Sequence, residues 1–239
     1  MPTLKMLDVT KSFTQTPILN VDSLYLKTSG IYGLIGPNGA GKTTLLKCLC
    51  GLLFPDTGTI FIDDERLSLT NHAEILMKIG SVFAQSDTIF NLTIDELLET
   101  HYYFYKLKRP RDWHTVLDSV GLKVPVQTKI GDLSLGMRQR LLLAVAITHQ
   151  PEFLFLDEPF NGLDPDGVLI VKQLIQKFAQ DKLVIITSHD LTDLQAVIEH
   201  VLIMTAGSVH PITSVSEIEN NYPNGLADYY QAIVHDKKK

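Results

Sequence analysis

The sequence predicts an α/β fold with a mostly parallel sheet, an N-terminal antiparallel β subdomain and an inserted helical subdomain. Short apolar runs alternate with helical segments near both ends of the chain, which is the pattern of a parallel sheet. A glycine-rich loop joins one of these runs to a helical segment. Between about residues 86 and 150 the pattern is helical throughout.

The first third of the chain is predicted to be mostly strands. Residues 4–9 and 21–26 are expected to be strands, with the turn region 14–17 between them. Further strands are expected at 31–35, 58–62 and 80–84, and a helix at 44–50. The last of these strands leads into Gln85.

The middle of the chain is predicted to contain three helices. The first, 93–108, begins at Thr93 and has Glu96 three residues later, which is the spacing of a capping box. The second covers 111–120 and the third 134–149, closed by Gly121 and Pro151 respectively.

Strands return after Pro151. Residues 153–156 form a continuous apolar run, as expected for a strand covered on both faces. A helix at 166–180, a strand at 183–187 and a helix at 190–198 follow. We therefore expect one domain over 1–212, with a core formed by 1–85 and 151–212 and a helical lobe at 86–150. Residues 213–239 are expected to form a short C-terminal helical appendage.

Composition narrows the class of protein. The 239 residues are 45% hydrophobic and 20% charged, and the net charge of −6 argues against a surface that binds nucleic acid. The longest apolar run, 141–147, is far too short to span a membrane, and the N-terminus lacks the apolar core of a signal peptide. Cys48 and Cys50 lie two apart on a predicted helix, so buried thiols are expected rather than a disulfide or a metal site.

The glycine-rich loop has the phosphate-binding pattern G-x-x-x-x-G-K-[ST]. It consists of Gly36, Pro37, Asn38, Gly39, Ala40, Gly41, Lys42 and Thr43. Because a strand precedes it and a helix follows, its backbone N–H groups are expected to surround a polyphosphate. Lys42 would reach the β- and γ-phosphates, and the Thr43 hydroxyl would bind Mg²⁺. The motif predicts the core of a P-loop NTPase.

Two later segments fit the same chemistry. Asp157 and Glu158 end an apolar strand, where ligands bind in open α/β sheets, so Asp157 is expected to hold Mg²⁺ and Glu158 to orient the attacking water. The alternative is a polar strand end that leads into a turn at Pro159. At 133–140, a Ser134 cap and Gly136 at a helix start predict an anion site, the alternative being an ordinary capped helix.

These motifs together resemble those of ATP-binding-cassette (ABC) ATPase subunits. The matching segments, in the family's order, are 36–43, Gln85, 133–139, 155–158, 162–164 and 188–189. The resemblance extends from Phe13 to about residue 210.

The resemblance implies roles on the chain's own nucleotide. Phe13 would stack on adenine, unless it is a core residue at a strand end. Thr44 would complete the phosphate loop. Gln85 would sense Mg²⁺ and the attacking water, and His189 would contact the γ-phosphate and that water, unless it merely begins a helix. Glu158, His189, Gln85 and Lys42 would be the catalytic group.

The resemblance also implies contacts with a second cassette. Ser134 and Gly136 would grip the γ-phosphate of a nucleotide held by the other subunit. Asp164 would couple the two sites, unless it and Asp166 are only turn and cap residues. Leu135 and Met137 depart from the usual signature Leu-Ser-Gly-Gly-Gln, which puts the tightness of the contact in doubt. Phe160 departs at a position where a small residue or Thr is common.

The implied protein is an ATP- and Mg²⁺-dependent ATPase subunit of a membrane transporter. It would form a homodimer, or a heterodimer with a related subunit, and act on a separate transmembrane permease at the cytoplasmic face of the membrane. The 135–141 and 161–165 stretches favour export of a drug, peptide or bacteriocin. An ABC ATPase that regulates a membrane or cell-wall assembly is the alternative. Chromosome-associated cassettes need a longer insertion than 86–150, and tandem-cassette ribosome factors need two phosphate loops.

Overall fold

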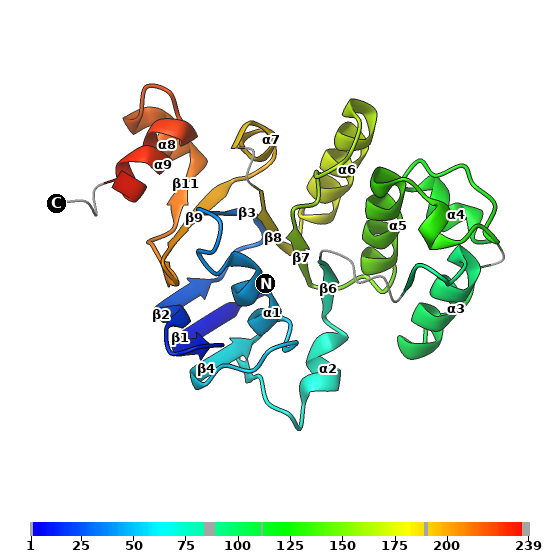
Figure 1. Cartoon of the computed structure of the whole chain (residues 1–239), viewed down its shortest axis with the longest axis horizontal. Coiled ribbons are helices and arrows are strands. Elements are labelled where there is room, and N and C mark those ends of the chain that lie inside the picture. The colour runs from blue at the N-terminus through cyan, green and yellow to red at the C-terminus, as the bar shows by residue number, and fades with distance from the viewer. Residues whose placement is uncertain (1, 84–88, 111, 189–190, 236–239) are drawn as a thin grey trace.

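The fold contains two β-sheets with helices on both sides of the larger one (Figure 1). The structure is a computed structural model that describes residues 2–83, 89–110, 112–188 and 191–235. The smaller sheet has the order β2-β1-β4-β5, and all its pairs are antiparallel. Its strands are β1 (Leu4–Ser12), β2 (Pro17–Leu26), β4 (Thr57–Ile62) and β5 (Glu65–Arg66).

The larger sheet has the order β10-β9-β3-β8-β7-β6, and a short β11 also pairs with β9. Its strands are β3 (Gly30–Ile35), β6 (Ile79–Val82), β7 (Phe153–Asp157), β8 (Leu183–Thr187), β9 (His200–Thr205), β10 (Ser208–Val209) and β11 (Thr213–Ser214). The pairs among β9, β3, β8, β7 and β6 are parallel, whereas β10 and β11 are antiparallel to β9. All residues of β3 and β8 are buried, as expected for central strands covered on both faces.

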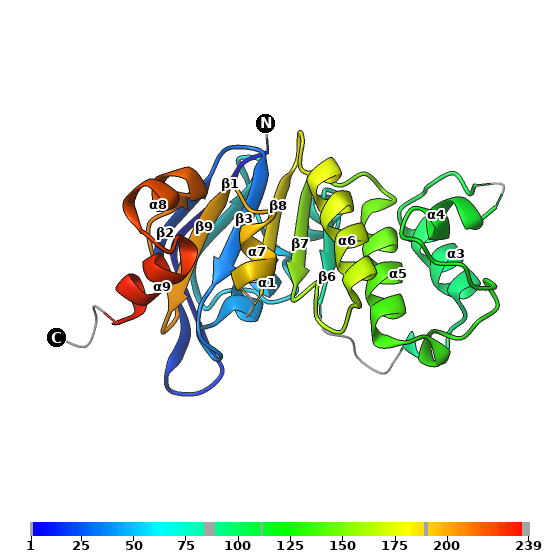
Figure 2. The ribbon, with the colours of Figure 1, turned by 90° about the horizontal axis from the view of Figure 1, so that it is seen from above.

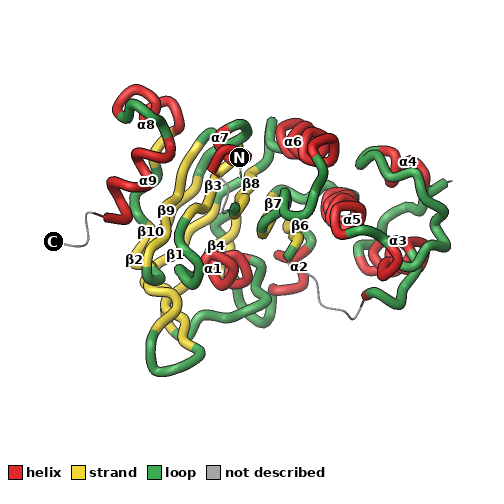
Figure 3. The backbone as a smooth tube through the Cα atoms, turned by 45° about the horizontal axis from the view of Figure 1, so that its top comes forward, coloured by secondary structure: helices red, strands yellow, loops and turns green. Residues whose placement is uncertain are grey.

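The helices flank the sheets and extend the molecule at both ends (Figure 2). Their bounds are α1 (Lys42–Leu49), α2 (His72–Leu76), α3 (Ile94–Phe104), α4 (His114–Asp118), the 3₁₀ helix η2 (Ile130–Asp132), α5 (Leu135–Ile147), α6 (Pro165–Phe178), α7 (Leu191–Gln195), α8 (Val215–Asn221) and α9 (Leu226–His235). Helices α3 and α4 lie at one end, and α8 and α9 at the other (Figure 3). Within the described ranges, no helix has the length and apolar character needed to span a bilayer.

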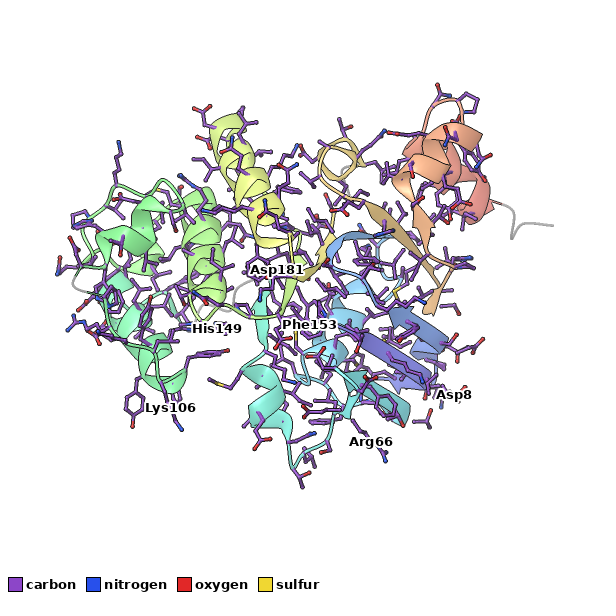
Figure 4. All side chains as sticks on the ribbon, turned by 180° about the vertical axis from the view of Figure 1, so that it is seen from behind. Asp8, Arg66, Lys106, His149, Phe153 and Asp181 are labelled. Carbon is purple, nitrogen blue, oxygen red and sulfur yellow. The ribbon has the colours of Figure 1, made fainter. Side chains whose placement is uncertain are left out.

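Three buried clusters hold these elements together. One lies between the two sheets and includes α1 residues Leu45, Leu46 and Leu49 together with Phe153 and Phe155 of β7. Figure 4 shows Phe153 among the crowded side chains at the centre of the molecule. A second cluster covers the opposite face of the larger sheet with side chains from α5, α6, α7, α8 and α9. The third joins α3, α4 and α5 away from the sheets.

The elements differ from the sequence prediction mainly at their ends. The first two strands are longer than 4–9 and 21–26, because their pairing continues to Ser12 and Pro17. Helix α7 ends at Gln195 rather than 198, and the chain then joins the larger sheet, where the Glu199 N–H donates to the Ile31 carbonyl 2.8 Å away. Helix α4 is shorter than 111–120, and residues 213–235 contain β11 as well as two helices. The prediction lacked α2 and β9.

Candidate nucleotide site

The phosphate loop connects the buried strand β3 to the first turn of α1. Gly41 precedes the helix with a φ of 104°, a left-handed conformation that glycine adopts readily. A Cβ at this position would lie 2.6 Å from the Ile18 carbonyl oxygen, so the loop also passes too close to β2 for a larger residue. The backbone N–H groups of the first turn of α1 face the loop, which makes this a favourable place for a phosphate.

Lys42 folds back over the phosphate loop. Its Nζ donates to the carbonyl oxygens of Gly36 at 2.7 Å and Pro37 at 3.1 Å. Partial burial lowers the pKa of Lys42, while the nearby carboxylates of Glu158 and Asp157 act in the opposite direction. The lysine is therefore hydrogen-bonded to the loop and lies within electrostatic range of the two acidic residues. A pocket of about 240 Å³ lies here, lined by Ile18, Asn38, Gly39, Ala40, Gly41, Lys42, Thr43, Thr44, Asp157 and Glu158.

A chain of hydrogen bonds connects the loop to the ends of two strands. The Thr43 hydroxyl donates to Asp157 Oδ2 at 2.7 Å, and the Thr187 hydroxyl donates to Asp157 Oδ1 at 2.7 Å. The Thr187 hydroxyl also accepts a hydrogen bond from the Glu158 N–H at 2.9 Å. Strands β7 and β8 bring these groups together, because Asp157 is paired with Thr187 in their parallel register. Thr187 is fully buried, so its hydroxyl holds both acidic residues from inside the protein.

Glu158 has an unusual backbone conformation. Its φ is 54°, in the left-handed region that non-glycine residues seldom occupy. The turn that follows is closed by a hydrogen bond from the Asn161 N–H to the Glu158 carbonyl at 3.2 Å, and Gln139 Nε2 lies 3.4 Å from the same oxygen. The side chain lines the pocket beside the phosphate loop. A carboxylate held there can accept a proton from a water molecule that attacks a bound phosphate.

The donor atoms near Thr43 fit Mg²⁺. A hydroxyl and a carboxylate are oxygen ligands, and both lie beside the phosphate loop. Among the described residues, no group of three or more His, Cys, Asp or Glu side chains could enclose a metal ion. Mg²⁺ usually binds one or two protein oxygens and completes its shell with phosphates and water, and the Thr43 hydroxyl and the Asp157 carboxylate could provide these two oxygens.

Ser134 and Gly136 lie at the start of α5 and do not line the pocket beside the phosphate loop. The Ser134 hydroxyl accepts the Met137 N–H at 3.2 Å, which confirms the predicted helix cap. A Cβ at Gly136 would lie 3.0 Å from the Gly162 carbonyl oxygen. Packing against the chain's own loop is therefore a reason for glycine here, besides the approach of a ligand that the sequence suggests.

The remaining predicted site residues lie at other places. Phe13 is 59% exposed, so it is not a core residue, and its ring lies 6.0 Å from Lys11 Nζ. Asp164 caps α6 by accepting the Gly167 N–H at 2.9 Å, and its role between subunits stays a prediction. Gln85 and His189 lie outside the described residues.

Phe160 is buried at the base of the loop between β7 and α6. Lys172 Nζ of α6 lies 5.6 Å from the centre of its ring and forms an ion pair with Asp193 of α7 at 2.8 Å. The large side chain is thus accommodated by packing against α6. Through Lys172, the loop is also linked to the helix that follows residues 189–190.

Sequence reasoning missed Thr187 as a site residue. The signal was a polar residue at the end of a buried strand, immediately before Ser188 and His189. That signal has meaning only when β8 is known to lie beside β7. Gln139 was likewise treated as part of a signature pattern, without its contact to the Glu158 carbonyl.

Comparison with known proteins agrees with this geometry. A family model described as ABC transporter matches residues 19–161. The bacitracin transport ATP-binding protein BcrA of Bacillus licheniformis is 36% identical over 208 residues, covering 86% of this chain and 68% of that protein. The lantibiotic transport ATP-binding protein SrtF of Streptococcus pyogenes is 31% identical over 207 residues, covering 86% of this chain and 88% of its own.

Solved structures match the fold over almost the whole chain. The ATP-binding subunit of an ABC transporter superimposes with a TM-score of 0.84 at 23% identity, covering 98% of this chain and 99% of that one. The dimeric structure of a bacterial ABC transporter cassette gives a TM-score of 0.78 at 26% identity, covering 88% of this chain and 98% of that one. The predicted fold class is confirmed. The chain therefore belongs to the ABC transporter family, as an ATP-binding cassette that hydrolyses ATP.

Proposed function

We propose that two copies of this cassette, or this chain and a related subunit, close face to face around two ATP molecules and drive a separate transmembrane permease. The observation that carries this proposal is the hydrogen-bonded chain from Thr43 through Asp157 and Thr187 to Glu158, beside the phosphate loop. Each nucleotide would contact the phosphate loop of one chain and residues Ser134 and Gly136 of the other.

The exposure of residues near the start of α5 and α6 supports a site that is shared between two chains. Ser134 and Asp164 are exposed, and Leu135, which follows Ser134, is 47% exposed. None of the three lines the pocket beside the phosphate loop. A second chain placed against this face would bring its own bound nucleotide into contact with these residues. Phe13, also exposed, would cover the adenine ring.

In the assembled site, Mg²⁺ bound to Thr43, Asp157 and Gln85 would neutralise charge on the phosphates. Lys42 would exchange its contacts with the Gly36 and Pro37 carbonyls for phosphate oxygens. Glu158 would orient the attacking water and accept its proton, with His189 contacting the γ-phosphate. Since the γ-phosphate joins the two chains, its loss would allow them to separate.

We further propose that residues 86–150 form a helical lobe that can move relative to a core formed by 1–85 and 151–212. The described helices of this lobe share a buried cluster that includes Leu98, Leu117 and Leu141, although α5 also packs against the larger sheet. A unit with its own core can rotate without unfolding. Gln85, at the junction, would sense the nucleotide, and the lobe would pass the movement to the permease. Residues 213–239 would be the C-terminal appendage of this division.

The names of the relatives support a proposal for the class of substrate. ABC ATP-binding subunits generally pair with transmembrane permeases, and the relatives described above are named for transport of bacitracin and of a lantibiotic. We therefore propose export of a drug, peptide or bacteriocin, with the chain bound to its permease at the cytoplasmic face of the membrane. Copurification from native membranes tests this: a multi-span partner whose substrate stimulates ATP hydrolysis is expected. A partner without a translocation pathway would instead favour an ABC ATPase that regulates a membrane or cell-wall assembly.

The catalytic role of Glu158 is tested by Glu158→Gln. The amide cannot accept a proton, so hydrolysis should fall by about 10²- to 10⁴-fold while ATP still binds. Size-exclusion chromatography with ATP and Mg²⁺ should then show an accumulated dimer. Near-normal turnover of this variant with its permease present would remove Glu158 from the proposed role.

A further inference from the structure

The first turn of α5 and the loop between β7 and α6 fit into each other within one chain. Gly162, in that loop, has a φ of 74°. A Cβ on Gly162 would lie 2.3 Å from Leu135 Cδ2 and 2.8 Å from Leu135 Cγ. The Leu135 side chain therefore occupies the space that any side chain at position 162 would need.

A second contact lies next to the first. A Cβ on Gly136 would lie 3.0 Å from the Gly162 carbonyl oxygen and 3.3 Å from Leu163 Cδ2. One turn further along α5, Gln139 Nε2 reaches to 3.4 Å from the Glu158 carbonyl. Helix α5 thus contacts the beginning of the loop at Glu158 and also the part of the loop near its tip. At this second contact, Gly136 faces Gly162.

Burial of apolar surface does not explain the position of Leu135. The side chain is 47% exposed, although the chain buries many leucines completely. Its contacts are instead directed to the loop that begins at Glu158. It also lines a cavity of about 210 Å³ with Phe90, Arg138, Gln139, Asp157, Glu158 and Asn161. Leu135 therefore lies between the exposed helix start and the acidic residues of the site.

We propose that Leu135 is a positioning residue that locks the 158–164 loop to the start of α5 in the same chain. The lock fixes the distance between Ser134 and Asp164, which both face outward, so that one rigid surface meets the second cassette. Its consequence for closure rests on the function proposed above, whereas the lock itself can be measured in a single chain. Glycine at 162 and leucine at 135 are complementary, and each should depend on the other.

A double-mutant cycle tests this dependence. The variants are Gly162→Ala, Leu135→Ala and the two combined, each in the full chain. Alanine at 162 collides with Leu135, so Gly162→Ala should raise the ATP concentration for half-maximal dimer formation by about tenfold. In the combined variant the collision is absent, and that concentration should return to the value of Leu135→Ala alone. ADP binding to the single chain should not change, because the phosphate loop is untouched.

Two controls separate the lock from general effects. Gly225→Ala introduces alanine at another left-handed position, with a φ of 62° and Gln195 Nε2 as the nearest atom at 3.2 Å. This variant measures how much stability is lost when alanine replaces glycine at a left-handed φ. Leu169→Ala removes another exposed leucine, from α6, whose side chain is 57% exposed. Both controls should leave the ATP concentration for dimer formation within about twofold of the unmodified chain.

The results that overturn the lock are distinct from those that overturn the proposed function. If Gly162→Ala changes the urea unfolding midpoint equally in the chain with Leu135 and in the chain with Leu135→Ala, the lock does not exist. If Leu135→Ala lowers the ATP concentration needed for dimer formation, Leu135 obstructs the partner instead of positioning the loop. If the unmodified chain forms no ATP-dependent dimer, the proposed closure fails, while the unfolding cycle still decides whether the lock is present.

Discussion

Replacing Thr187 by valine tests whether this buried residue holds the two acidic groups in place. Valine has nearly the same shape as threonine but neither donates nor accepts a hydrogen bond. Two contacts would be lost: the bond from Thr187 to Asp157 Oδ1, and the bond to Thr187 from the Glu158 N–H. Since Thr187 has no exposed surface, water cannot replace its hydroxyl without rearrangement of the strands.

The magnitude follows from these two contacts. A hydrogen bond to a charged group contributes about 1.5–3 kcal/mol, and an unpaired buried N–H costs about 1–3 kcal/mol. The cost of the unpaired N–H is reduced, because Glu158 follows the end of β7 and is only partly buried. We therefore expect Thr187→Val to lower the free energy of unfolding by about 2–4 kcal/mol. A displacement of Glu158 by about 1 Å would lower the ATP hydrolysis rate about 10²-fold.

Urea unfolding and steady-state ATP hydrolysis at several Mg²⁺ concentrations measure these effects. The matched control is Thr187→Ser, which keeps the hydroxyl and removes one methyl group at a cost of about 1 kcal/mol. Serine should retain most of the hydrolysis rate, whereas valine should not. Equal hydrolysis rates and equal Mg²⁺ dependence in the two variants would refute the role assigned to the hydroxyl.

Two further predictions concern buried titratable groups away from the nucleotide. Burial, aided by the neighbouring His149, lowers the pKa of His101 to about 4, and burial also lowers the pKa of His149. Because the unfolded chain binds protons below about pH 6.5 and the folded chain resists them, the free energy of unfolding should fall from pH 6.5 towards pH 4. Urea unfolding of His101→Phe should show a weaker pH dependence, and an unchanged one would contradict this. Burial raises the pKa of Cys48 to about 11 and of Cys50 to about 12, so iodoacetamide at pH 8 should label both only after unfolding, as mass spectrometry can show.

Signals that lie close together in the sequence predicted their structures well. The capping box at Thr93 is present, with the Thr93 N–H donating to Glu96 Oε2 at 2.7 Å and the Glu96 N–H donating back at 3.2 Å. The phosphate loop lies between β3 and α1 as its pattern requires. In each case the residues that form the feature are within ten positions of one another, so the sequence contains the whole interaction.

Features that depend on strand order or on contacts between distant segments were not predictable. Thr187 and Asp157 meet only because β8 lies beside β7, which no local pattern encodes. Leu135 was recognised as a departure from the signature, but its contact with Gly162 depends on how α5 packs against the loop before α6. The sequence therefore indicated which residues are unusual, while the structure indicates which of them touch.

Glu158 is held from two sides, which determines how a movement of the proposed helical lobe would affect catalysis. Its N–H is bound to Thr187 of the central sheet, and its carbonyl lies 3.4 Å from Gln139 of α5. Helix α5 belongs to two buried clusters, since Leu143 packs with the sheet and Leu141 with the lobe. A rotation of the lobe that carries α5 with it would therefore move the Glu158 carbonyl while Thr187 keeps the N–H in place. Because the backbone there already has a φ of 54°, the carboxylate should respond to small displacements of α5. Gln139 is thus the single side chain that would couple a movement of the proposed lobe to the position of the Glu158 carboxylate.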